Sequence, residues 1–214
     1  MSRRAAVPRR VPDPIHDERA PPAPPARPPP SRAWGALALA FYAVHASHHV
    51  LHGHPEDLLW ACHLGAVCVG TGLLARLPTV NAVGFLWLAM GDALWLLDVA
   101  GGGEFIPTSL LTHAGGLAVG ALGLTRFGMP RHSWWRAILA FIALQQLCRF
   151  VTPPAANINV AHAVWSGWED VFPGYVGYQI VLLSIGAAGF FAIEWVSRRV
   201  LGRLAEGSIK ITSA

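Results

Sequence analysis

The stretch VNAVGFLWLAMGDALWLLDV, residues 80–99, decides the fold class of this chain. A helical run of this length, with few charges, suits the roughly 30 Å hydrocarbon layer of a membrane. Five further apolar stretches of similar length lie on either side of it, at residues 33–51, 58–77, 107–127, 134–151 and 175–196. With 53% hydrophobic and only 13% charged residues, the chain is too apolar for an ordinary soluble domain. The sequence therefore predicts an all-α polytopic membrane protein with six transmembrane helices.

The arginines predict the orientation of these helices. They precede the first stretch, end the second at Arg76, join the fourth to the fifth, and follow the sixth, while acidic residues occupy the intervening ends. Only Arg149 breaks this alternation. Because positive residues in short loops stay in the cytoplasm, we expect both termini to be cytoplasmic, in a multi-pass protein of the inner (plasma) membrane if the source is bacterial. The net charge of +4 follows from this topology, so membrane lipids are the expected partners and nucleic acid is not.

Composition divides the chain into three parts. Residues 1–32 hold ten prolines and seven arginines and are expected to form a disordered cytoplasmic tail. Residues 33–197 form the predicted six-helix transmembrane domain, which includes a long outer loop at residues 152–174. Residues 198–214 are expected to form a basic cytoplasmic tail suited to an anionic membrane surface.

Histidines mark the predicted outer side of the bundle. Eight of the ten fall there: His45, His48, His49, His52, His54, His63, His113 and His162. Polar groups inside a membrane helix are costly and usually mark a function. The sequence therefore predicts one polar site near the outer leaflet.

A thiol and its partners form one interpretation of this site. Cys62 and His63 lie about 8 to 9 Å below the outer end of the second stretch, and His113 lies at about the same depth in the fourth. A thiol becomes a nucleophile when a nearby base stabilises its thiolate and a third group orients that base. We predict Cys62 as nucleophile, His113 as base, and Asp92 or Asp98 as the orienting carboxylate. The candidate substrate-binding residues are His63 and, around the long loop, Asn157, Asn159, His162 and Tyr178.

The same motifs resemble a known family. The Cys62-His63 step, His113, the Asn157-Ile158-Asn159 run and the segment from Phe172 to Tyr178 are similar to those of the YwaF-like six-helix membrane proteins, over roughly residues 55–196. The plan is also similar to the androgen-induced-protein group of intramembrane lipid hydrolases, which use a hydroxyl nucleophile and a histidine on separate helices. The resemblance implies a thiol-dependent lipid acyl hydrolase or acyltransferase. The histidine-rich end of the first stretch and the sequence around His162 depart from the family pattern.

That histidine-rich end carries the alternative interpretation, a metal- or haem-binding membrane protein. Its four candidate ligands share one stripe of a helix: His45, His48, His49 and His52. Two of them could bind a transition metal, with His63, His113 or His162 completing the shell. Alternatively, His48 or His49 could hold a haem together with His113. A third interpretation, a small transporter, is disfavoured because the chain shows no repeated halves.

Overall fold

The described chain is built from six α-helices in the order that the sequence predicts. The computed structural model describes residues 29–212, although beyond Leu201 only the side chain of Arg203 is described. Within that range no strand occurs, which confirms the all-α fold class. Of the disordered tail expected over residues 1–32, residues 1–28 lie outside the described residues, and Arg32 already begins the first helix. The helices are α1 (Arg32–Leu51), α2 (Ala61–Leu74), α3 (Pro78–Ala100), α4 (Gly116–Phe127), α5 (Ser133–Val151) and α6 (Tyr175–Thr212).

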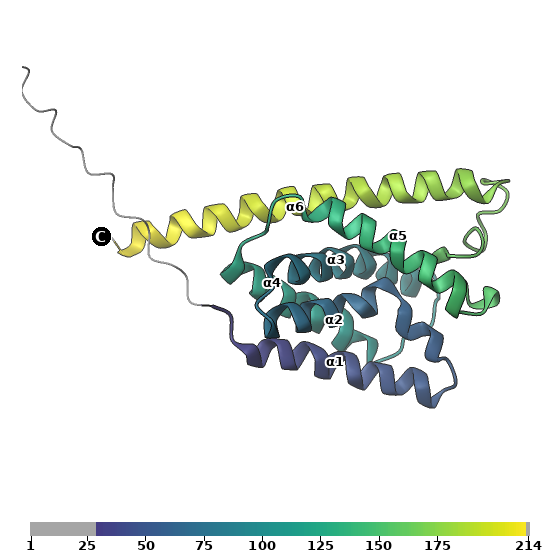
Figure 1. The fold of residues 1–214 in the computed structure, drawn as a ribbon, viewed down its shortest axis with the longest axis horizontal. Helices are drawn as coiled ribbons and strands as arrows, with labels where there is room; N and C mark the ends of the chain where they lie inside the picture. The colour runs from purple at the N-terminus through teal and green to yellow at the C-terminus, as the bar shows by residue number, and fades with distance from the viewer. Residues whose placement is uncertain (1–28, 213–214) are drawn as a thin grey trace, which may run out of the picture.

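Helix α2 lies at the centre of the packing between α1 and α3, while α5 and α6 lie on the far side of the molecule from α1 (Figure 1). Glycines allow the close approach of these helices. A Cβ on Gly84 of α3 would lie 2.5 Å from the carbonyl oxygen of Gly65 in α2. A Cβ on Gly35 of α1 would lie 2.7 Å from the carbonyl oxygen of Gly70. Small residues at such contacts let helix backbones pack against each other.

In the described part of the chain, four short non-α segments lie where the sequence predicts either helix or undivided loop. The chain enters α2 through a 3-10 turn, η1 (Pro55–Leu59), so this helix begins at Ala61 rather than at residue 58. A π-helical turn, η2 (Leu111–Gly115), precedes α4. The loop at residues 152–174 contains two further 3-10 turns, η3 (Pro154–Ala156) and η4 (Ile158–Val160). Helix α6 continues to Thr212, well past the expected end at residue 196.

Two helices have the length and composition to cross a membrane, α3 over its whole length and α6 over Tyr175–Leu201. Helix α2 is apolar but has only 14 residues. Helix α1 carries its histidines, and α5 carries Arg136, Gln145 and Arg149, which lower their hydropathy. The structure thus supports two candidate membrane spans, and the six-span arrangement goes beyond what these helices show by themselves.

Candidate histidine and cysteine site

Five buried polar side chains meet at one end of the bundle. They come from the last two turns of α1, the first turn of α2, the second half of α3 and the π turn η2. Each is at most 9% exposed: His45, His49, His63, Asp92 and His113. We call this the histidine end of the bundle. Buried polar groups are costly unless they are paired. The partners of these five residues therefore indicate which chemistry the site can support.

His45 is the centre of the cluster. Its Nε2 atom lies 3.1 Å from Nε2 of His63 and 3.2 Å from Nε2 of His49. Its Nδ1 atom lies 3.0 Å from the hydroxyl oxygen of Thr108. One nitrogen of each of these three rings, from two helices, therefore points into one small volume, and one candidate ligand atom from each ring lies within 4.8 Å of the other two.

Asp57 orients two of these rings. His63 donates from Nδ1 to the Asp57 carbonyl oxygen at 2.7 Å, and Nδ1 of His49 lies 3.2 Å from Oδ2 of the Asp57 carboxylate. Because both oxygens can only accept, each Nδ1 carries the proton, and in the neutral rings each Nε2 presents a lone pair. Trp60 fixes the carboxylate by donating from Nε1 to Oδ1 at 3.1 Å. The 3-10 turn η1 holds Asp57 in this position, above the start of α2.

His113 is oriented in the same way by Asp92. Its Nδ1 atom lies 2.6 Å from Oδ1 of the carboxylate, and its ring stacks on Trp95 with centroids 4.7 Å apart. The π turn contributes here, because an extra residue in a helical turn changes the direction of the side chains that follow. Thr112 ties this turn to α1 by donating to the carbonyl oxygen of Phe41 at 3.3 Å. The Nε2 atom of His113 is thereby left for another partner.

Cys62 lies beside this second pair. One ligand atom each of Cys62, His63 and His113 lies within 4.8 Å of the other two. Helix α3 approaches Cys62 closely, since a Cβ on Gly91 would lie 2.6 Å from the Cys62 Cβ. The structure thus brings Cys62, His113 and Asp92 together in the order thiol, imidazole, carboxylate. His63 belongs to both groups, so the two halves of the site adjoin.

The stripe of four histidines on α1 is divided by the packing. His45 and His49 are buried in the cluster, whereas His48 is half-buried and His52 is exposed. The rings of His48 and His52 stack on each other with centroids 4.0 Å apart, and Nδ1 of His52 donates to the His48 carbonyl oxygen at 2.7 Å. Of the four predicted ligands on α1, only His45 and His49 therefore face the site.

The predicted substrate-binding residues of the long loop make contacts that hold the loop in place. Asn159 accepts from the backbone N–H of Ala61 at 2.9 Å and donates to the Leu59 carbonyl oxygen at 2.7 Å, so it caps the start of α2. Asn157 accepts from the backbone N–H of His162 at 3.0 Å. Tyr178 packs edge-on against Phe172. In the described part of the chain, no hydrogen bond or ion pair joins these loop side chains to the histidine end.

Three residues of the site are absent from the sequence-based prediction of its members: Asp57, Thr108 and Trp95. In the sequence, Asp57 is one of the acidic residues that define the predicted topology. The available signal was its position, since a carboxylate between a histidine-rich helix end and a Cys-His step is well placed to orient imidazoles. Thr108 and Trp95 carry no signal of this kind, because their contacts depend on how the helices pack.

The packing of the buried histidines does not favour the haem alternative, which pairs His48 or His49 with His113, because His48 lies outside the cluster. The Nε2 atoms of His45, His49 and His63 are within hydrogen-bond distance of each other, and the rings of His63 and His113 have centroids 5.7 Å apart. A porphyrin between two axial histidines also needs lateral clearance for its ring system, and Asp92, Trp95 and Thr108 pack directly against these rings. The close spacing of the ring nitrogens is that of ligands gathered around one point.

Comparison of the chain with protein-family models, with curated proteins and with solved structures finds no match. The resemblance to the YwaF-like family stays a prediction from its motifs.

Proposed function

We propose that this protein is an integral membrane protein with six spans and cytoplasmic termini that binds a transition-metal ion at the histidine end of its bundle. The membrane assignment draws on α3 and α6, which are long and apolar enough to cross a bilayer. It also draws on the large apolar side chains that α3 and α6 leave uncovered, among them Leu94, Leu97, Ile185 and Phe191. Large apolar side chains left exposed along such helices suit lipid as their solvent.

The observation that carries the metal proposal is the convergence of three imidazole nitrogens. Two ligand nitrogens on one tetrahedral zinc ion are about 3.4 Å apart, given metal–nitrogen distances of about 2.1 Å. The Nε2 atom of His45 lies 3.1 and 3.2 Å from its two neighbours, close to that spacing. A small outward movement of each ring would admit an ion between the three nitrogens.

The orientation of the rings supports the same conclusion. Metal-binding histidines commonly donate their other N–H to a carboxylate, a carbonyl or another oxygen, which sets the tautomer and aims the free nitrogen at the metal. His49 and His63 follow this pattern through Asp57, and His45 can follow it through Thr108. Without a metal, the three Nε2 atoms share at most one proton, which His45 would supply to two acceptors. An ion satisfies all three lone pairs at once.

The ligand set indicates the class of ion. Imidazole suits zinc, copper, nickel and iron, and does not suit magnesium or calcium, which prefer oxygen. The adjoining group of Cys62 and His113 lies next to His63, so it is the nearest source of a fourth ligand. A softer ion such as zinc or copper(I) would favour the thiolate in that position.

The test is the metal content of the protein purified in detergent after loading with zinc or copper. We expect about one equivalent per chain, lost in His49→Ala and in His63→Ala. The matched controls are His48→Ala and His52→Ala, which lie on the same helix but outside the cluster, and these should retain the ion. Equal metal content in all four variants, or none in the parent protein, would contradict the proposal.

The triad-like order of Cys62, His113 and Asp92 favours a second candidate function, a thiol-dependent lipid acyl hydrolase or acyltransferase. Here His113 would take the thiol proton at Nε2 while Asp92 holds its Nδ1 proton at 2.6 Å. An acylating lipid probe should then label the parent protein and Cys68→Ala, but not Cys62→Ala or His113→Ala. Labelling that survives in Cys62→Ala would exclude this function. Labelling that resists a chelator would separate it from the metal site.

A further inference from the structure

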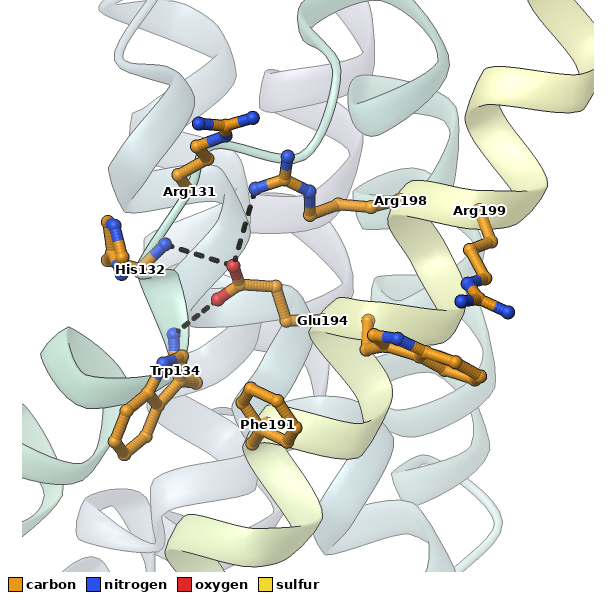
Figure 2. Close-up of a pocket in the computed structure, with 8 residues that line it drawn as sticks. Arg131, His132, Trp134, Phe191, Glu194, Arg198 and Arg199 are labelled. Atoms are coloured by element: carbon orange, nitrogen blue, oxygen red, sulfur yellow. Dashed lines mark hydrogen bonds and ion pairs between the residues drawn. The ribbon is translucent and has the colours of Figure 1, made fainter.

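The end of the bundle opposite the histidines contains an open pocket of about 540 Å³ between the start of α5 and the middle of α6 (Figure 2). Three arginines line it: Arg131, Arg198 and Arg199. A single carboxylate, Glu194, lines it with them. The pocket therefore has an excess of positive charge. How much of this charge is unpaired depends on whether Glu194 pairs with the arginines or with other groups.

Glu194 is occupied with the backbone of α5. Its Oε1 atom accepts from the N–H of His132 and its Oε2 atom from the N–H of Trp134, each at 2.9 Å. It is only 6% exposed. Arg198 approaches Oε1 no closer than 3.8 Å, which is a weak ion pair. Figure 2 shows the carboxylate directed at the two backbone nitrogens, with the guanidinium groups of Arg131 and Arg198 on one side of it.

The other two arginines have no acidic partner in the part of the chain that the structure describes. No described carboxylate lies within 4 Å of Arg131 or Arg199. The guanidinium of Arg199 lies 3.8 Å from the ring centroid of Trp195, so it is held by a cation–π contact that leaves its N–H donors available. Planar guanidinium groups with free donors are suited to phosphate oxygens.

Aromatic side chains form the remaining walls of the pocket. Trp134 packs edge-on against Phe191 with centroids 6.0 Å apart, and Trp195 lies one turn further along α6. Tryptophan is typical of the headgroup level of a membrane, where one edge is apolar and the other is wet. Phe191 is 54% exposed, so an acyl chain can continue from the pocket along α6.

We infer that this pocket binds the headgroup of an anionic phospholipid, to which Arg131 and Arg199 supply positive charge from opposite sides of the pocket. Basic pockets at the cytoplasmic ends of membrane helices are suited to anionic lipids of that leaflet. The inference rests on the membrane topology of the proposed function, but it does not depend on the metal ion. It names a site at the other end of the bundle, built from other residues.

The experiment is a binding titration of the full-length protein in detergent with short-chain phosphatidylglycerol, phosphatidylcholine and inorganic phosphate as separate probes. We expect saturable binding of phosphatidylglycerol and about fivefold weaker binding for each of Arg131→Gln and Arg199→Gln. The matched control is Arg76→Gln, an exposed arginine of the turn between α2 and α3 that does not line the pocket. Arg198 is left unchanged because it pairs with Glu194.

Each other outcome overturns the inference. Equal affinity for phosphatidylcholine would remove the role of net charge, and equal affinity for inorganic phosphate would indicate a site for a soluble anion. Unchanged binding in both variants would remove the pocket. If a variant fails to fold, a photoreactive phosphatidylglycerol on the unaltered protein replaces it, and crosslinks must map to residues 131–134 or 191–199. The metal-site variant His49→Ala should bind the lipid normally, so a failure of one proposal is distinguishable from a failure of the other.

Discussion

At the scale of single residues, Asp57 connects the local sequence to the properties of the site. Its carboxylate aims one histidine and its backbone carbonyl oxygen aims another. We expect Asp57→Asn to weaken metal binding about 10- to 100-fold, because removing a partner that orients a ligand typically has this effect. A competition titration against a chelator measures the dissociation constant. Glu56→Gln is the control, since Glu56 pairs at 3.5 Å with the exposed His54. Equal affinities in the two variants would show that Asp57 does not orient a ligand.

The residue scale also shows how much of the site could be predicted from the sequence. Helical periodicity places His45, His48, His49 and His52 on one stripe, and depth along the helices correctly groups Cys62 with His113. Periodicity cannot tell which part of a stripe a neighbouring helix covers, so the division between the buried and the outward pair depends on packing. The contribution of Asp57 depends on a 3-10 turn, which has no distinct composition.

At the scale of elements, α5 begins at a carboxylate supplied by a different helix. His132 is in the left-handed region at φ 64°, and no side chain of its own segment caps the first turn. Glu194 instead satisfies two N–H groups that would otherwise lack partners. We expect Glu194→Ala to lower the free energy of unfolding by about 2 to 3 kcal/mol. The change should appear as a fall of several degrees in the apparent Tm in detergent. Ser184→Ala, on the exposed face of the same helix, should change stability by less than about 0.5 kcal/mol. Similar shifts in the two variants would contradict the capping role.

The six helices and their order could be predicted because long apolar runs bounded by proline, glycine and arginine are a strong signal. Their exact ends could not. The π turn before α4 and the extension of α6 to Thr212 both lie where hydrophobicity is ordinary. At the π turn, the hydrogen bond from Thr112 to α1 contributes to the backbone geometry, and hydrophobicity does not report such a contact.

At the scale of the whole molecule, the proposed topology places the histidine end outside and the arginine pocket inside. Gly102 and Gly128 test it as a matched pair, since both have positive φ and open space around them. In intact cells, a membrane-impermeant maleimide should label Gly102→Cys and leave Gly128→Cys unlabelled. The unaltered chain reports the background from Cys62, Cys68 and Cys148. Labelling of Gly128→Cys alone would reverse the orientation, and labelling of both would argue against a sealed bundle.

The glycine contacts between α1, α2 and α3 have a consequence for how tightly the histidine end can hold an ion. Backbones in van der Waals contact cannot slide past each other, so the three helices that carry His45, His49, His63 and Asp92 form a stiff frame. The conformational entropy of the ligand side chains and their helices is then lost when the chain folds. Little further entropy is lost when the ion binds. Adding a single methyl group to this frame, as in Gly84→Ala, would push α3 away from Gly65 of α2, two residues from His63, and would weaken the binding of the ion.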